Sequence, residues 1–295
     1  MRNPEIILNT LCSHSSDADY KYERLYRLFF NEELFMVAYE RIKSKPGNMT
    51  PGSDGKTIDG MSLERINALI SSLKDESYIP NPAKRVYIPK KNGKLRPLGI
   101  PTIEDKLVQE VARMILEAIY EGYFEDTSHG FRPSRSCHTA LNSLQKRFTG
   151  SRWFIEGDIK GFFDNIDHSV LVDILRKRIA DERFIRLIWK FLRAGYLEIW
   201  HYHNTYSGTP QGGIVSPILA NIYLDQFDKY MAEYAENFKK GNKRKVNPEY
   251  DSLKKKLAKV RKKWKSETDE TVKACLFERI KELQAKCLSV PAGLQ

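Results

Sequence analysis

Cysteine is scarce in this 295-residue chain, and long hydrophobic runs are missing altogether. The sequence contains no run of about 18 uncharged apolar residues, which predicts that no segment spans a membrane and that no membrane partner is needed. The first residues carry a single arginine and a broken apolar run, a pattern unlike a secretory signal. The cysteines are far apart and form no Cys-x-x-Cys pair, which argues against a zinc site or a disulfide framework and favours a reducing compartment: Cys12, Cys137, Cys275 and Cys287.

Positive charge is concentrated near the end of the sequence. The net charge is +11, and residues 231–295 hold 17 Lys and Arg against 9 Asp and Glu, whereas the first 230 residues hold 32 against 29. A basic protein prefers polyanions, and nucleic acid is the commonest polyanion in the cytoplasm. A lysine-rich helix is equally typical of a solvated face, so for this segment both interpretations stay open.

Residues 153–168, WFIEGDIKGFFDNIDH, contain the most informative stretch. Period-two alternation predicts a strand over residues 152–156, which places Asp158 at its carboxyl end. Phe162 and Phe163 follow, and Asp167 or His168 is positioned to cap a helix that begins near Ser169. A carboxylate at the end of a buried strand, beside aromatic rings, suits a divalent metal and a nucleotide. The alternative is a hydrophobic strand followed by a polar turn.

Residues 84–101, KRVYIPKKNGKLRPLGIP, predict a β-hairpin with its turn at Asn92-Gly93. Six of its residues are cations, and a basic hairpin can lie over a triphosphate. Charged edges also protect strands from unwanted pairing, so a purely structural role is the alternative.

Helical periodicity covers much of the remaining sequence. Helices are predicted over residues 20–43 with a break at Asn31, from Ser62, from Thr102, and from Ser134 or Ser136. The loop before this last helix carries Arg132 and Arg135, which favours a phosphate site at the helix N-terminus. Between the predicted helix that ends at residue 43 and the one that begins at Ser62 lies a glycine-rich loop with Lys45 and Lys56. This loop suits contact with a phosphate backbone, and a flexible connector is the alternative.

The last third of the sequence contains a tight loop and a basic helical hairpin. Pro210, Gln211, Gly212 and Gly213 form a loop that a substrate can approach closely, and a helix is predicted from Ser216. His201 and His203 alternate on a predicted strand and, with no third ligand nearby, are interpreted as exposed strand residues. Residues 250–264 and 272–287 predict an antiparallel helical hairpin with a narrow apolar seam and a lysine-rich outside.

Five stretches match one family in order and roughly in spacing: KRVYIPKKNGKLRPLGIP, the helix behind it, HGFRPSRSCHTAL, DIKGFFDNIDH and GTPQGGIVSPILANIYLDQFD. On these motifs, which extend from about residue 20 to 230, the chain resembles the reverse transcriptases encoded by group II introns, also called maturases. The resemblance implies an α+β fold with right-hand polymerase fingers and a partial palm, mostly helical with short antiparallel strands. It divides the chain into an N-terminal extension with helical fingers (1–79), further fingers (80–151), a partial palm (152–230) and a basic helical-hairpin insertion (231–295).

The resemblance also implies roles for individual residues. Asp158 is similar to the first catalytic aspartate, which binds both magnesium ions with help from the backbone carbonyl of Ile159. Phe163 is similar to the steric gate that disfavours a ribonucleotide 2′-OH. Lys84, Lys90 and Arg96 are similar to the residues of the fingers that hold the triphosphate of the incoming nucleotide. Pro210 and Gln211 are similar to residues of the family's nucleotide-binding loop.

One departure from the family is large. Two-metal phosphoryl transfer needs several carboxylates, and the Tyr-x-Asp-Asp turn that supplies two of them is missing, as is any Asp-Asp pair. The expectation is a truncated form that binds RNA without complete catalysis, while Asp164 and Asp167 take structural roles.

The expected parent is an RNA-directed DNA polymerase and splicing maturase in a bacterial cytoplasm, with an organelle as the alternative location. Its expected partners are group II intron RNA, an RNA template with a DNA primer, and deoxynucleoside triphosphates, and whether two copies pair is left open. A splicing-only RNA-binding maturase and a retron-type bacterial reverse transcriptase are the alternatives.

Overall fold

Helix α4 (Ile103–Tyr120) is buried along nearly its whole length, with 14 of its 18 residues inaccessible. Its sequence predicts an apolar stripe, and the structure covers the other faces as well, because helices α1 (Pro4–Cys12) and α2 (Glu32–Lys43) pack against it. The buried polar residues of α4 therefore need partners within the protein. Each of them has such partners: Asp105, Lys106, Gln109 and Glu110.

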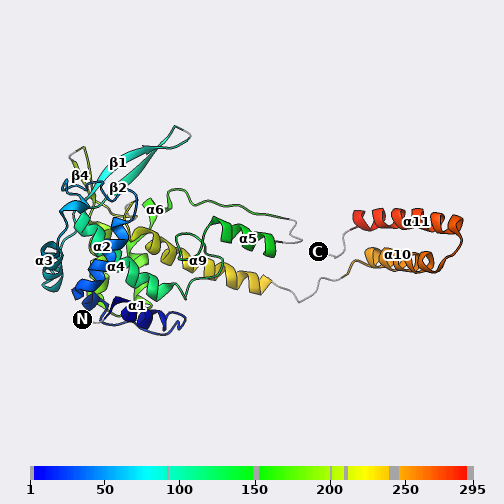
Figure 1. The fold of residues 1–295 in the computed structure, drawn as a ribbon, viewed down its shortest axis with the longest axis horizontal. Coiled ribbons are helices and arrows are strands. Elements are labelled where there is room, and N and C mark those ends of the chain that lie inside the picture. The colour runs from blue at the N-terminus through cyan, green and yellow to red at the C-terminus, as the bar shows by residue number, and fades with distance from the viewer. Residues whose placement is uncertain are drawn as a thin grey trace. The chain divides into compact units, whose positions relative to one another are not determined.

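A computed structural model describes residues 3–91, 93–148, 153–199, 201–208, 212–238 and 246–290. The chain divides into two compact units, residues 1–231 and 232–295 (Figure 1). The first unit combines helices with one small sheet, which confirms the predicted α+β class. In the described ranges, no helix combines the length and apolar character needed to cross a bilayer.

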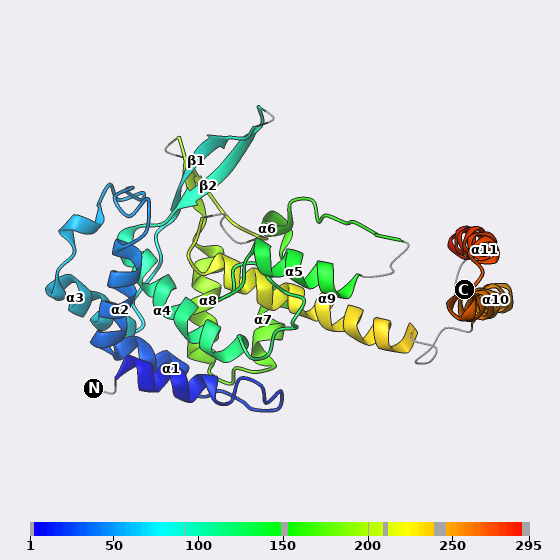
Figure 2. The ribbon, with the colours of Figure 1, turned by 45° about the vertical axis from the view of Figure 1, so that its right-hand side comes forward.

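The sheet contains four strands in the order β2-β1-β3-β4. Strands β1 (Ala83–Pro89) and β2 (Leu95–Ile100) form the predicted antiparallel hairpin, whose tip points away from the helices in Figure 2. Strand β3 (Tyr196–Glu198) runs parallel to β1 and pairs with β4 (His201–His203). The β1–β3 pairing joins segments more than 100 residues apart and has no local signal in the sequence.

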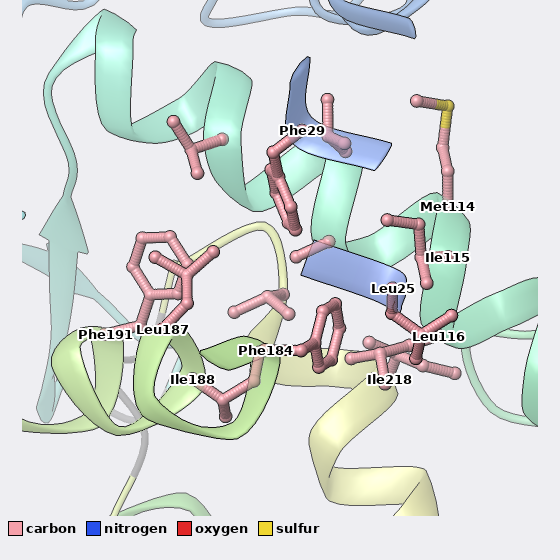
Figure 3. Packing of buried hydrophobic residues seen from close by; sticks show 14 of the residues in the cluster. Leu25, Phe29, Met114, Ile115, Leu116, Phe184, Leu187, Ile188, Phe191 and Ile218 are labelled. Atoms are coloured by element: carbon pink, nitrogen blue, oxygen red, sulfur yellow. The ribbon is translucent and has the colours of Figure 1, made fainter. Parts of the chain in front are cut away.

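The hydrophobic core gathers aromatic and branched side chains from helices far apart in the sequence (Figure 3). The rings of Phe29 in η1 (Leu25–Phe30) and Phe184 in α8 (Glu182–Arg193) lie 6.0 Å apart. Helix α7 (His168–Arg176) packs against α8, and α3 (Leu63–Lys74) packs against η1 and α2. A short 3-10 turn, η2 (Ile58–Gly60), precedes α3 and buries Ile58.

Helix boundaries follow the capping residues of the sequence. The side chain of Asn31 accepts a hydrogen bond from the Glu33 amide and separates η1 from α2, as predicted. Ser62, Thr102, Ser136 and Asp167 cap α3, α4, α5 (Cys137–Arg147) and α7. The hydrogen bonds that Asp167 accepts from Ser169 and Val170 also lower the pKa of its carboxyl group.

The prediction of a strand over residues 152–156 is wrong for residues 153–156, which are the part of this range that the structure describes. Residues 153–159 form no strand, and the side chains of Trp153 and Ile155 are 85% and 94% exposed. Alternating apolar residues form a strand only where a second strand supplies backbone hydrogen bonds. No described segment pairs with this one, and it leads instead into the short helix α6 (Phe162–Asn165).

Arg178 ties the N-terminal segment to the core. Its side chain is buried, and its guanidinium group donates to the carbonyl oxygens of Ile119 at 3.1 Å and Asp17 at 2.7 Å. The guanidinium carbon also lies 4.4 Å from the ring centroid of Tyr123. Nη1 and Nη2 of this buried arginine therefore have acceptors and its flat face lies over a ring, whereas its Nε has no hydrogen-bond partner among the described residues.

Helix α9 (Ser216–Phe238) begins in the core and extends beyond it. Asn221 on α9 donates a hydrogen bond to the carbonyl of Gly130 at 2.8 Å, which anchors the loop before α5, and both views show α5 alongside α9 (Figures 1 and 2).

The second unit is the predicted helical hairpin, formed by α10 (Pro248–Ser266) and α11 (Glu270–Ser289). Its own small core is centred on Leu257, Ile280 and Leu283.

Replacement of Asp105 by alanine tests the buried polar anchor at the start of α4. The carboxylate accepts hydrogen bonds from the Tyr78 hydroxyl at 2.5 Å, the Thr102 hydroxyl at 2.6 Å and the Asn81 amide at 3.0 Å. Burial raises the pKa of Asp105, and these bonds offset part of that effect. We expect Asp105→Ala to lower the free energy of unfolding by about 2–4 kcal/mol in urea titrations, because two buried hydroxyl groups and one partly buried amide lose their acceptor.

The exposed cap Asp269 of α11 provides the control for this experiment. Asp269→Ala should change the unfolding midpoint far less, because water replaces the lost acceptor. Equal effects of the two substitutions would contradict the role assigned to Asp105.

Candidate nucleotide and RNA site

The basic hairpin presents different residues on its two faces. Strand alternation and the register, in which Lys84 pairs with Ile100 and Ile88 with Arg96, place Lys84 and Arg96 on one face. Lys90 continues this alternation just beyond β1, where its amide donates to the Lys94 carbonyl at 2.7 Å. The three cations expected to hold a triphosphate therefore share one side of the hairpin.

Arg85 lies on the opposite face. Its guanidinium carbon is 3.5 Å from the ring centroid of Tyr196 on β3, and the Tyr196 ring stacks on His203 at 4.9 Å. A guanidinium group over an aromatic face is held in a fixed orientation while its edge stays free to donate hydrogen bonds.

A hollow of about 390 Å³ opens between this face of the hairpin and α6, and we call it the Phe163 hollow. Phe163 and Asp164 line it from α6, and Arg85 lines it from β1. The volume is in the range of small-ligand sites. The other lining residues come from β2, β3 and the loop after β4: Pro97, Gly99, Tyr196, Asn204, Thr205, Tyr206, Ser207 and Gly208.

Gly208 fixes the loop after β4 at the rim of this hollow. Its amide donates to the Ile166 carbonyl at 2.8 Å, and its carbonyl accepts a hydrogen bond from the His168 ring at 2.6 Å. Its φ is +82°, and a Cβ atom at this position would lie 2.5 Å from the Phe163 carbonyl oxygen. Only glycine fits such a conformation and such a contact.

Gly212 fixes the far end of the same loop against β2. Its φ is +110°, and a Cβ atom would lie 2.3 Å from the Gly99 carbonyl oxygen. Two residues later, the Ile214 amide donates to the Gln109 side chain of α4 at 2.8 Å. Pro210 and Gln211 lie outside the described residues, but both ends of the loop that carries them are anchored, one at α6 and the other at β2.

Asp158 and Ile159 lie in the exposed segment before α6 and do not line the Phe163 hollow. Within the described ranges, no group of three or more His, Cys, Asp or Glu side chains is close enough to hold a metal ion. A two-metal site needs several carboxylates, so the residues described here do not fit a complete magnesium site.

Arg132, predicted to bind RNA, is instead an internal brace. It is buried, and all five of its N–H donors have protein acceptors, namely the carboxylate and carbonyl of Glu121 and the carbonyls of Glu125 and Ser128. Its guanidinium group also lies over the Phe124 ring. No donor remains for a phosphate, which corrects the prediction.

The other cations predicted to contact RNA are more accessible. Arg135 pairs with Asp126 at 3.1 Å, where the aspartate is 75% exposed, and Lys56 lies 4.0 Å from Glu104. Lys45 is exposed at a second hollow, of about 330 Å³, which Arg113 and Phe131 also line. These three residues stay predictions.

Two features of the site were missed by the sequence interpretation: the position of Arg85 and the contribution of residues 204–207. Arg85 is one of six cations in the hairpin, and period-two alternation alone separates it from its neighbour Lys84. Knowing which face meets α6 requires the β1–β3 pairing, which the sequence does not reveal.

Residues 88–246 match the reverse transcriptase (RNA-dependent DNA polymerase) family. The chain belongs to this family. The match includes β2, α6, the loop between Gly208 and Gly212, and α9, so it spans most elements that surround the Phe163 hollow.

Several curated proteins are similar to the chain. The group II intron-encoded protein LtrA of Lactococcus lactis subsp. cremoris is 48% identical over 279 residues, which cover 94% of this chain and 47% of LtrA. An uncharacterized 91 kDa protein in the cob intron of Schizosaccharomyces pombe is 51% identical over 72% of this chain and 27% of its own length. A putative COX1/OXI3 intron 1 protein of Saccharomyces cerevisiae is 43% identical over 78% of this chain and 28% of its own. The chain thus spans about half the length of LtrA and less of the two yeast proteins.

Alanine at Gly212 tests the anchoring of the loop. We expect Gly212→Ala to destabilise the first unit by about 2–4 kcal/mol, because a positive φ and a backbone clash add together. Gly93, in the hairpin turn, provides the control, since its φ is +76° and a Cβ atom there meets nothing within 4 Å. Gly93→Ala should cost only about 1 kcal/mol. The stability of both variants is measured by thermal unfolding. Equal losses of stability in the two variants would contradict the anchoring role assigned to Gly212.

Proposed function

We propose that the complete protein is an RNA-directed DNA polymerase and a splicing maturase of a group II intron. The chain described here supplies the fingers, part of the palm and a basic helical hairpin, binds intron RNA, and lacks a full catalytic site. The proposal rests on membership of the reverse transcriptase family and on the similarity to intron-encoded proteins.

One structural observation supports the polymerase part most directly. Phe163, the basic hairpin and the loop that carries Pro210 and Gln211 come from three separate parts of the sequence, and contacts through Gly208 and Gly212 bring them together. An aromatic side chain, cations and a loop with close backbone approach are the groups that an incoming nucleotide needs for its sugar, phosphates and base.

Within this arrangement, a deoxynucleoside triphosphate enters at the Phe163 hollow. The Phe163 ring excludes a 2′-OH by contact, and Arg85, oriented by Tyr196, donates to phosphate oxygens from inside the hollow. Lys84, Lys90 and Arg96 lie on the other face of the hairpin, and the resemblance to the family assigns them to the incoming triphosphate. In the complete protein, Asp158 would provide one of the carboxylates for magnesium, together with carboxylates that the described residues do not supply.

The proposed setting is a reducing compartment that contains the intron RNA, such as a bacterial cytoplasm. The proposed partners are the intron RNA, an RNA template with a DNA primer, and deoxynucleoside triphosphates.

The sugar selectivity of the complete gene product tests the role of Phe163. Phe163→Val should raise incorporation of ribonucleotides relative to deoxyribonucleotides by roughly ten- to a hundred-fold, because the ring no longer excludes the hydroxyl group. Phe162, in the same helix, instead contacts Tyr223, with ring centroids 6.1 Å apart, so Phe162→Val should reduce both rates without changing their ratio. An unchanged ratio in Phe163→Val would refute the steric-gate assignment.

A splicing-only maturase is the second candidate, since RNA binding and splicing do not need the carboxylates of a two-metal site. We expect Asp158→Asn in the complete product to abolish primer extension and to leave RNA binding and intron splicing intact. The 295-residue chain alone should bind RNA, with an affinity that falls at least about tenfold between 50 and 200 mM salt, and should not extend a primer. Splicing without any primer extension by the unmodified complete product would establish the second candidate.

A further inference from the structure

The two helices of the C-terminal hairpin carry very different charge. Helix α10 contains eight Lys and Arg residues against two Asp and Glu, whereas α11 contains four against three. Both helices contribute to the same apolar seam, so packing does not require this asymmetry.

The cations of α11 are already neutralised. Each one pairs with a carboxylate on its own helix: Lys273 with Glu270, Arg279 and Lys286 with Glu282, and Lys281 with Glu278, at 2.5–3.5 Å. On α10, Lys255 pairs with Asp251 at 2.6 Å. Its other seven cations form no ion pair within the part of the chain that the structure describes, and all seven are exposed.

Four of these α10 cations form a continuous row, which we call the α10 stripe: Lys254, Arg261, Lys262 and Lys265. The spacing places them on one flank of the helix, over about 17 Å at 1.5 Å per residue. They line a groove of about 600 Å³ together with Tyr250, Leu257, Ala258 and Cys287. Ala258 sits in the middle of the row, where its small side chain leaves the groove open.

The row has an energetic cost for the isolated helix. Arg261 and Lys265 are one turn apart, as are Lys262 and Lys265, and like charges at these spacings destabilise a helix by a few tenths of a kcal/mol each. An anionic partner that lies along the groove removes this repulsion, and the energy so gained contributes to its binding.

We propose that the α10 stripe binds the phosphate backbone of RNA, with several consecutive phosphates along the groove. The choice of RNA as the polyanion rests on the proposed function. A membrane surface fits less well, because the large apolar residues of α10 beside the stripe, Leu253, Leu257, Val260 and Trp264, pack in the seam with α11 instead of facing outward. A row of cations around a small central residue matches a continuous strand of phosphates rather than one carboxylate.

A matched pair of substitutions in the 295-residue chain tests the proposal. Ala258→Glu places a negative charge in the middle of the stripe, and Ala285→Glu makes the same change on an exposed position of α11. Glutamate is a good helix former, so both variants should keep the hairpin, as circular dichroism would verify. With a fluorescein-labelled RNA stem-loop at low salt, we expect Ala258→Glu to raise the Kd about tenfold and Ala285→Glu less than about twofold.

Two further measurements sharpen the test. Ala258→Lys should lower the Kd severalfold, a gain that misfolding cannot produce. The double variant Lys254→Gln, Lys262→Gln should make the dependence of log K on log salt shallower by about one to two units, because fewer phosphate contacts form.

Each remaining outcome counts against the proposal in a distinguishable way. Equal weakening by Ala258→Glu and Ala285→Glu, with RNA still bound by the unmodified chain, overturns the α10 stripe and leaves the proposed function standing. No salt-dependent RNA binding by the unmodified chain overturns both. If Ala258→Glu loses binding to phosphatidylserine vesicles while its RNA binding is unchanged, the partner of the α10 stripe is a membrane surface and not RNA.

Discussion

The burial of α4 on all its faces is the constraint on which the first unit depends. Because no side of this helix meets water freely, its polar residues must bond to the protein, and three of them hold segments outside the helix. Asp105 fixes the chain before β1, Lys106 the loop at Thr50, and Gln109 the loop before α9. The bond from the Ile214 amide to Gln109 also bears on the Phe163 hollow, because it fixes the chain next to Gly212, which lies against the lining residue Gly99.

Close backbone approach completes the site. Gly208 lies against the carbonyl of Phe163 beside α6, and Gly212 lies against the carbonyl of Gly99 in the edge strand β2. A side chain at either position would push the loop away by its own volume. The Phe163 hollow therefore depends on two glycines at least as much as on the residues that line it.

Arginine serves two opposite purposes in this protein. Arg132 and Arg178 are buried and direct their donors at backbone carbonyls or a carboxylate, which stabilises loops that have no regular structure. Arg85 lines the Phe163 hollow and Arg261 lines the groove along α10, where a ligand can reach them. Burial and nearby acceptors distinguish the two groups, whereas sequence context alone led to the wrong role for Arg132.

The sequence by itself determined the elements whose signals are local: the helices with caps at Asn31, Ser62 and Thr102, the β-hairpin, and the helical hairpin with its basic outside. For two further caps it left a choice, Ser134 or Ser136 and Asp167 or His168, and the structure shows Ser136 and Asp167. It also determined the family, because motifs in a fixed order along the chain can be identified without knowledge of the fold. Tertiary structure alone decided the β1–β3 pairing, the face of the hairpin that meets Phe163, the internal role of Arg132 and the absence of a strand at residues 153–159. Each of these depends on a partner distant in the sequence, and a residue pattern does not specify which partner is present.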